Sequence, residues 1–396
     1  MKIKIANPCP RFLTVWALIL IPVYIVLALY ASRLYTGGDF LRWTVPDREG
    51  DTEISTWVNG DTCYVFLPSY ARIEDLSFQI NPLFRVSVNG VSLNAAANLG
   101  NFSTDVSYPL KIQSIIPVSV RFLQFFISEN IPALYLQTEP GGLEQIQKSK
   151  EKKTTVTGTL FDTDGTGVYT GTRDTLKCRG QGSWTLPKKS YSLNLENDAS
   201  LLGMPEGSMW ALIANYLDPT NLRNKLAYEL VGKSGFVLSP SCEYVSLYTN
   251  GAYQGLYLLV QKPEDVVNRV FDTRTLSSGG EAGFLCKNDL PYRFNTLRHP
   301  FMTDNGRAVK ITLPETVLEK EKERIVRQVQ DMEDAILNSA ESDLWPVCLD
   351  LDSWCGKYLL EELLGNIDAD FASSYFYCLN TDESPIFSAD WRGTTI

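Results

Sequence analysis

The sequence WALIANYLDPTNLRNKLA occupies residues 210–227 and is the most specific pattern in the chain. Within it, Asp218-Pro219-Thr220 precedes Arg223 and Asn224, where the pattern indicates the start of a helix. A guanidinium at Arg223 suits a bound phosphate or an internal carboxylate, because it pairs with both. A structural role for Arg223 is an equally good interpretation of these residues alone.

A basic pair begins a predicted strand upstream. Lys188 and Lys189 precede the alternating apolar residues Tyr191, Leu193 and Leu195. A lysine at this position can reach phosphate oxygens as a point charge, and we favour Lys189 for that role. Taken alone, a solvated lysine at the end of a strand is the better interpretation.

A short glycine pattern precedes the basic pair, in Lys177-Cys178-Arg179-Gly180-Gln181-Gly182-Ser183-Trp184. Its two glycines would let the backbone approach a phosphate group, but an ordinary turn explains them as well.

A second group of polar residues lies near the end of the chain. Asn366 and Asp368 follow a predicted helix over 353–364, which Asp352 or Ser353 is suited to cap. The Asn-x-Asp arrangement offers oxygen ligands that suit magnesium, or a catalytic base. Without further information, a helix-capping turn is the better interpretation of Asn366 and Asp368.

These stretches, in this order, resemble the spore-coat protein H (CotH) kinase-like family, and the resemblance spans roughly residues 126–391. The chain is similar to a membrane-anchored bacterial member. The resemblance implies an atypical protein-kinase-like fold that binds ATP and Mg²⁺ and phosphorylates Ser or Thr of surface or spore-coat proteins. It implies nucleotide contacts from Lys189, Lys188, Arg179 and Arg223, metal ligation by Asn366 and Asp368, and a catalytic role for Asp368.

Some residues depart from the family pattern. Gln181 and Gly182 replace the usual Asn-Ser pair, and Gln261 stands where the family often has Glu. If that acid pairs with the nucleotide lysine, its replacement weakens the positioning of the lysine.

The largest departure is at the end of the sequence. The family continues into W-D-[FY]-D, whose aspartate coordinates metal, whereas this chain ends with residues 388–396, SADWRGTTI. Codons for Arg392 to Ile396 can be chosen so that another reading frame gives Trp-Asp-Tyr-Asp. We therefore interpret the sequence as truncated or frameshifted, which leaves both activity and its loss open for the chain as it stands; a degenerate remnant is the other interpretation.

An uncharged apolar run covers residues 12–31, long enough to cross a bilayer as a helix. Lys2, Lys4 and Arg11 precede it, which favours a cytoplasmic N-terminus and an extracytoplasmic remainder. Residues 1–35 are therefore predicted to be a cytoplasmic tail with a single-pass anchor to the cell membrane. A cleaved signal peptide is the competing interpretation.

Local patterns beyond the anchor predict an α+β protein with two globular parts. Short alternating segments at 63–67, 76–80 and 84–88 indicate a β-sandwich-like module over 40–125. The kinase-like part is predicted over 126–396. In it, Asn250-Gly251 marks a hairpin, and apolar spacing predicts a helix over 315–338.

Composition excludes several classes of function. A net charge of −10 disfavours a nucleic-acid partner. The single histidine, His299, leaves histidine-based zinc sites and relays without ligands. The eight cysteines form no C-x-x-C motif, and their spacing is compatible both with disulfides and with free thiols.

Two alternatives to a kinase stay open at this point. The chain fits a noncatalytic cell-surface or spore-envelope scaffold, in which the sandwich module binds a polymer or a protein. A carbohydrate-active enzyme is less well supported, because no suitably spaced carboxylate pair stands out.

Overall fold

The computed structural model describes residues 10–47, 50–94, 99–180, 182–236, 239–262, 264–266, 283–314, 316–339, 348–366, 374–378 and 385–390. It confirms a mixture of helices and strands, with strands in the majority. The chain divides into two compact units, which are described separately. The first contains Met1–Gly141, Val156–Thr172 and Val245–Leu256, and the second contains Gly142–Thr155, Arg173–Tyr244 and Tyr257–Ile396.

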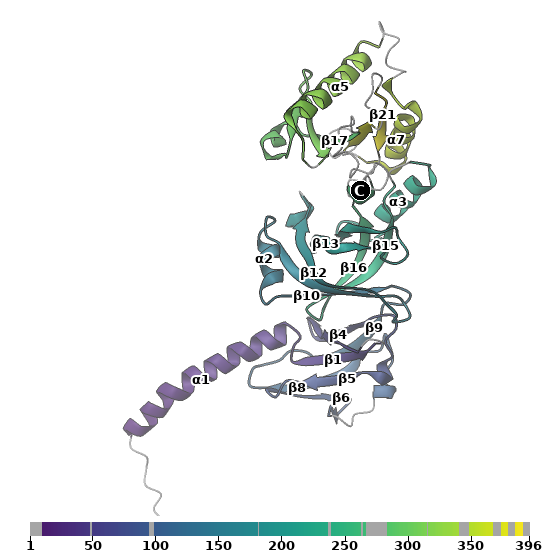
Figure 1. The fold of residues 1–396 in the computed structure, drawn as a ribbon. Helices are drawn as coiled ribbons and strands as arrows, with labels where there is room; N and C mark the ends of the chain where they lie inside the picture. The colour runs from purple at the N-terminus through teal and green to yellow at the C-terminus, as the bar shows by residue number, and fades with distance from the viewer. Residues whose placement is uncertain are drawn as a thin grey trace, which may run out of the picture. The chain divides into compact units, whose positions relative to one another are not determined.

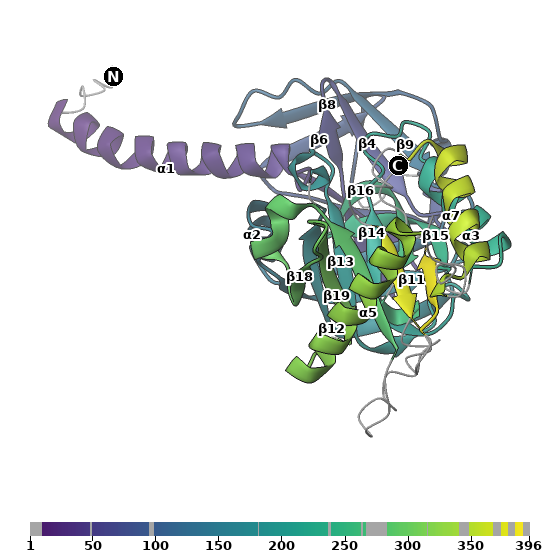
Figure 2. The same ribbon diagram turned by 90° about the horizontal axis from the view of Figure 1, so that it is seen from above.

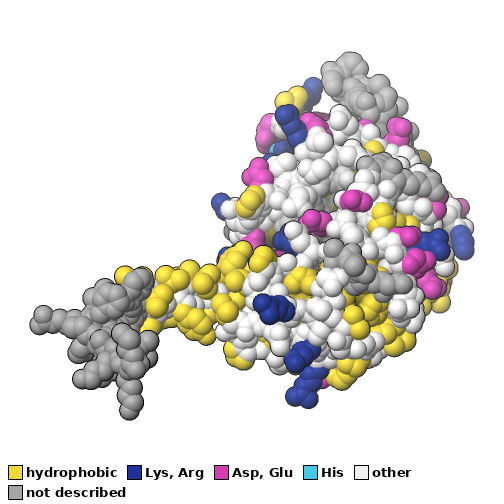
Figure 3. Space-filling model, turned by 90° about the horizontal axis from the view of Figure 1, so that it is seen from below, with side chains coloured by type: hydrophobic (Ala, Val, Ile, Leu, Met, Phe, Trp, Pro, Cys, Tyr) yellow, Lys and Arg dark blue, Asp and Glu magenta, His cyan; other side chains and the backbone are white. Residues whose placement is uncertain are grey.

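The first unit begins with the apolar helix α1, Pro10–Thr36. Its segment Leu18–Thr36 has a mean hydropathy of 1.9 and is only 6% buried, so hydrophobic side chains cover its surface (Figure 3). The length and composition of this helix match those of a membrane span, and a signal sequence near an N-terminus shares both properties.

Two sheets follow in the first unit. One has the order β2-β1-β5 and the other β3-β4-β9-β8-β6-β7. Their strands are β1 (Leu41–Pro46), β2 (Asp51–Ser55), β3 (Trp57–Asn59), β4 (Thr62–Leu67), β5 (Ser77–Ile80), β6 (Phe84–Val88), β7 (Val91–Ser92), β8 (Tyr108–Ser114) and β9 (Phe122–Ile127). The strands predicted at 63–67, 76–80 and 84–88 are thus confirmed. Two short 3-10 helices, η1 (Ile73–Asp75) and η2 (Leu99–Asn101), connect them.

Trp43 anchors the core of the first unit. Its ring lies edge-on to Phe125 at 5.1 Å. The buried indole N–H donates to Thr56 Oγ1 over 3.2 Å, so burying this polar group leaves no unmet donor.

Seven strands form a closed barrel in the order β10-β11-β12-β13-β14-β16-β15. They are β10 (Ala133–Thr138), β11 (Thr154–Phe161), β12 (Gly167–Arg179), β13 (Ser190–Ala199), β14 (Gly207–Ile213), β15 (Cys242–Thr249) and β16 (Ala252–Gln261), with α2 (Gly142–Lys148) after β10 and η3 (Ser183–Thr185) after β12. Several of these strands contribute residues to both units (Figure 1). The predicted hairpin is confirmed: Asn250 and Gly251 have φ values of 50° and 81°, as a tight β15–β16 turn requires.

The second unit also contains a sheet of order β18-β19-β17-β20-β21. Its elements are β17 (Phe284–Asp289), η5 (Pro291–Thr296), β18 (Pro300–Met302), β19 (Ala308–Leu313), β20 (Tyr375–Cys378) and β21 (Phe387–Asp390). The helices of this unit include α3 (Arg223–Lys233), α5 (Glu319–Leu337) and α7 (Leu351–Leu364). Helix α5 lies across the sheet (Figure 2), with Ile325 and Val329 in the same core as Phe284 and Ile311.

Helix α5 confirms the helix predicted over 315–338, although its apolar face is shorter than expected. Ile325, Val329 and Met332 are buried, whereas Leu318 and Ile336 are exposed. The seven cysteines within the described residues all carry free thiols.

The cap of α7 differs from the sequence prediction. Asp350, rather than Asp352 or Ser353, is the N-cap, and it accepts from the Ser353 N–H over 3.3 Å. The same carboxylate accepts from Ser388 Oγ over 2.9 Å. The sequence did not single out Asp350, because one of its two hydrogen bonds comes from Ser388 in the neighbouring strand β21. Ser388 is distant from Asp350 in sequence.

We expect Asp350→Ala to lower the free energy of unfolding by about 1 to 2 kcal/mol, because both the helix cap and the link to β21 are lost. Asp352→Ala is the matched control, since its exposed side chain lies in the first turn of the same helix. Urea unfolding monitored by circular dichroism measures the difference. Equal effects of the two substitutions would contradict the assigned cap.

Candidate functional site

Strand register places two basic residues of β12 on one face of the barrel wall. Arg179 pairs with Ser190 and Lys177 with Ser192. Residues paired across strands share a face, while Cys178 between them belongs to the opposite, buried face. The face with Arg179 and Lys177 continues through β14 and β16 to apolar residues that pack beneath α3, so it is the outer face of the barrel.

Lys262 follows β16 and adds a third cation to this face. Its Nζ donates to Asn194 Oδ1 over 2.8 Å, and its backbone N–H donates to Met209 O over 2.8 Å. Burial lowers the pKa of Lys262 to about 8, against the opposing effect of Glu264. The like charges of Arg179 and Lys177 contribute to this lowered value.

The residues just after Lys262 bring negative charge next to these cations. Asp265 is buried and accepts from the Met209 N–H over 2.5 Å. Glu264 Oε2 is also buried and has no hydrogen-bond partner within the described part of the chain. An unmet buried carboxylate oxygen is costly, so Glu264 offers an acceptor toward any donor that enters here.

Strands β17 and β19 contribute further charges. Asp289 is buried and pairs with Lys287 at 3.1 Å and Arg293 at 3.3 Å. Burial opposes ionisation of Asp289, but the Leu290 N–H and these two cations outweigh it and lower its pKa. Burial lowers the pKa of Lys310, while Glu264 raises it.

Glu264 therefore interacts electrostatically with both Lys262 and Lys310. Six basic residues that interact electrostatically through shared neighbours are called the cationic cluster below: Lys177, Arg179, Lys262, Lys287, Arg293 and Lys310. Cations held near one another attract anions, and burial of Lys262 and Lys310 strengthens that attraction.

The basic pair singled out in the sequence lies against aromatic rings. Lys189 Nζ donates to Trp184 O over 2.7 Å. Lys188 Nζ lies 4.5 Å from the centre of the Tyr257 ring, and burial lowers its pKa to about 8. Arg179 is the predicted nucleotide contact that the structure brings into the cationic cluster.

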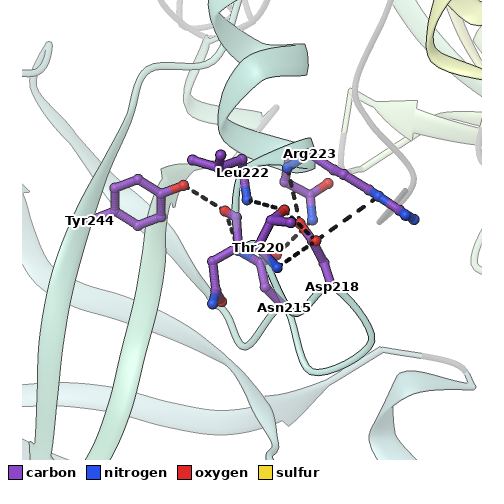
Figure 4. Close-up of polar contacts among 8 residues, drawn as sticks. Asn215, Asp218, Thr220, Leu222, Arg223 and Tyr244 are labelled. Carbon is purple, nitrogen blue, oxygen red and sulfur yellow. Dashed lines mark hydrogen bonds and ion pairs between the residues drawn. The ribbon is translucent and has the colours of Figure 1, made fainter.

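The stretch at 210–227 forms a helix-capping loop (Figure 4). Asp218 accepts from the Thr220 N–H at 3.1 Å, from Thr220 Oγ1 at 2.6 Å and from the Arg223 N–H at 3.0 Å. The Arg223 side chain is 62% exposed and lies 4.0 Å from the same carboxylate. Arg223 thus meets an internal carboxylate and still presents its guanidinium to solvent.

A buried network orients Asn366. Its Nδ2 donates to Glu361 Oε2 over 2.7 Å, and Glu361 in turn pairs with the buried Lys357 at 2.6 Å. Metal ligation by this side chain would use its Oδ1, because the amide nitrogen has no lone pair to offer. Asp368, the predicted catalytic residue, lies outside the described residues.

Sequence reasoning missed Lys262, Asp289 and Lys310. Lys262 directly follows an apolar strand, and Asp289 ends another, so strand-end charges were the available signal. In the sequence, Gln261 stands out only because the family often has Glu at that position. In the structure its Nε2 donates to Pro205 O at 3.1 Å and Glu206 O at 3.2 Å.

A family model described as CotH kinase protein matches residues 176–391, which is more than half of the 396 residues. The matched range includes all six members of the cationic cluster and the loop that caps α3. No curated protein matches the chain.

We expect Asp218→Ala to lower the free energy of unfolding by about 2 to 3 kcal/mol near pH 7, because two hydrogen bonds from Thr220 and one from the first residue of α3 are lost. Burial opposes ionisation of Asp218, but the bonds from Thr220 and Arg223 prevail and lower its pKa. The stabilisation of the fold by the Asp218 carboxylate is therefore complete above about pH 4. It is lost as the pH falls through the pKa of Asp218 in the folded state. Urea unfolding at several pH values tests this; an undiminished difference in strong acid would contradict it.

Proposed function

This chain belongs to the CotH kinase protein family, and on that basis we propose that it transfers phosphate from ATP to Ser or Thr of proteins at the cell surface or spore coat. We place this activity outside the cytoplasm, on a chain anchored through residues 12–31. The single observation that carries the proposal is the cationic cluster.

The cluster has the properties that nucleotide phosphates require. Phosphoryl transfer depends on positioning and on neutralising charge, so a site needs several fixed cations. Lys262 is held by Asn194, and burial lowers its pKa although Glu264 and Asp265 raise it. Bound phosphates would add negative charge and favour the protonated lysine.

Among the predicted nucleotide contacts, Arg179 fits this site directly. We propose Arg179 and Lys262 as the principal phosphate contacts. Lys189 and Arg223 are further candidates, whereas Lys188, whose ammonium lies over the Tyr257 ring, is proposed to make no phosphate contact.

The proposal also includes a divalent metal. Asn366 is oriented by Glu361, and we propose Asn366 and Asp368 as ligands, with Asp368 also acting near the attacking hydroxyl. A bound Mg²⁺ would neutralise charge on the phosphates. Glu361 acts as a positioning residue, because its carboxylate fixes the amide plane of Asn366.

Lys262→Met should weaken ATP binding at least about tenfold near pH 7, because a charge-assisted contact to phosphate is removed. In the unaltered protein, affinity should fall as the pH rises through about 8, where Lys262 loses its proton. The charged groups around Lys262 are Lys177, Arg179, Glu264 and Asp265. Titration calorimetry over this pH range measures both effects.

Lys188→Met is the matched control, since burial also lowers the pKa of Lys188 to about 8 but its ammonium lies on Tyr257. This control should keep both the affinity and the pH dependence. If Lys188→Met loses binding and Lys262→Met does not, the nucleotide lies beside Tyr257 instead of the cationic cluster.

Asp368→Ala should remove most of the gain in ATP affinity that Mg²⁺ provides, because one proposed ligand is lost. The exposed Glu362→Ala is the control and should keep this gain. ATP titrations with and without Mg²⁺ measure it, together with radiolabelled phosphate transfer to a protein acceptor. A chain that binds no ATP in either condition would favour the noncatalytic scaffold.

A further inference from the structure

One face of helix α1 packs against the rest of the first unit. Ala31 is fully buried in the core of that unit, and Leu34 and Tyr35 pack against the same core. Ala28 is half-buried, and Tyr24 forms a hydrogen bond to the unit. These positions recur every three or four residues, so they lie along one face of the helix. The unit therefore extends beside α1 for about three turns before the helix ends.

The bond to Tyr24 comes from the connection between β8 and β9. Tyr24 Oη donates to the Ile115 carbonyl oxygen over 3.1 Å. Ile115 directly follows β8 and begins the sequence Ile-Ile-Pro-Val, residues 115–118, called the apolar loop below. Ile115 is 38% exposed, and Ile116 and Val118 are only partly buried. The apolar loop thus presents hydrophobic side chains to its surroundings next to a helix whose own surface is hydrophobic.

Positive charge flanks the apolar loop on both sides. Lys111 in β8 and Arg121 just before β9 are both exposed, and no acidic residue lies between them in the sequence. Lys and Arg favour the level of the lipid headgroups, and their long side chains can reach that level while neighbouring residues lie deeper. An apolar tip between two basic residues therefore suits a segment that enters the surface of a membrane.

The position of Tyr24 on α1 sets how far the apolar loop reaches. The uncharged run of residues 12–31 is about 30 Å long as a helix, which matches the hydrocarbon thickness of a bilayer. From Tyr24 to Ala31, at the end of this run, the helix rises about 10 Å. When α1 spans a membrane, a segment bonded to Tyr24 therefore lies near the boundary between headgroups and acyl chains. Amphipathic segments that bind membranes lie at a similar depth.

We propose that the apolar loop enters the outer leaflet of the membrane beside α1 and is held there by Tyr24. This inference rests on the anchoring part of the proposed function. Backbone polar groups in lipid have no water to bond, so each needs a partner within the protein. The bond from Tyr24 satisfies the Ile115 carbonyl and the phenol of Tyr24 at once. The first unit then touches the membrane at two places, which fixes its orientation toward the bilayer.

A soluble partner fits this position less well. With α1 across the membrane, the apolar loop lies below the bilayer surface, where a soluble protein cannot follow. The side chains of residues 115–118 also offer no hydrogen-bond donor or acceptor to such a partner. A second copy of this chain is the other occupant able to approach α1 within the bilayer, and the experiment below distinguishes it from lipid.

Photocrosslinking to lipid tests this proposal on the full chain. A benzophenone amino acid replaces Ile115, and the purified chain is placed in phosphatidylcholine vesicles that contain a radiolabelled phospholipid. Illumination should attach labelled lipid to the chain. The yield should be at least about tenfold above that of the same group at Tyr358, an exposed residue of α7. The same group at Leu20 reports whether α1 itself lies in lipid.

A change at Tyr24 tests how the apolar loop is held. Tyr24→Phe removes the hydrogen bond but keeps the ring, so it should lower the lipid yield at position 115 at least about threefold. Tyr30→Phe is the matched control, because Tyr30 is another exposed tyrosine of α1, and it should change nothing. Circular dichroism establishes that each variant is folded. An unchanged yield in folded Tyr24→Phe would overturn the role of Tyr24.

The position at Leu20 separates failure of the loop from failure of the anchor. Labelled lipid at Leu20, with a yield at Ile115 no higher than at Tyr358, would overturn the proposal and leave the anchor intact. Crosslinking of Ile115 to a second copy of the chain instead of lipid would overturn it as well. Absence of lipid at both Leu20 and Ile115 would overturn the anchor together with the loop. None of these results depends on ATP binding or phosphate transfer.

Discussion

The alternation of side chains along β12, β13, β14 and β16 constrains both the core and the candidate site. Tyr191 and Trp210 fill one face of these strands, and Lys177 and Arg179 occupy the other. A register shift of a single residue would bury the cations and expose the rings, so the register is strongly specified. The apolar core thereby fixes where positive charge accumulates.

Sequence patterns predicted those elements whose signals are local. The Asn250-Gly251 hairpin, the strands at 63–67 and 84–88 and the helix near 319–337 are each specified by their own residues. Features that depend on distant partners were missed. Asp350 caps α7 partly through Ser388, and Lys262 becomes part of a site only because Arg179 lies on a neighbouring part of the same face.

The stretch that best identifies the family and the residues that form the candidate site lie in different parts of the chain. The stretch around Asp218 identified the family most clearly, yet its contacts within the described residues build a helix cap. A long and specific sequence pattern can therefore reflect the requirements of a turn as readily as those of a catalytic site. The cationic cluster, by contrast, is assembled from residues that are spread over several strands and connections, so no single contiguous motif marks it.

Gln261 attaches the loop at residues 205 and 206 to the barrel through an amide group that does not titrate. Its amide donates to two backbone carbonyls at residues 205 and 206 from a fully buried position. A glutamate at position 261 would repel both carbonyl oxygens unless its carboxyl group were protonated. The attachment of the loop at residues 205 and 206 would then depend on pH. With glutamine at this position, the loop stays attached to the barrel over a wide range of pH.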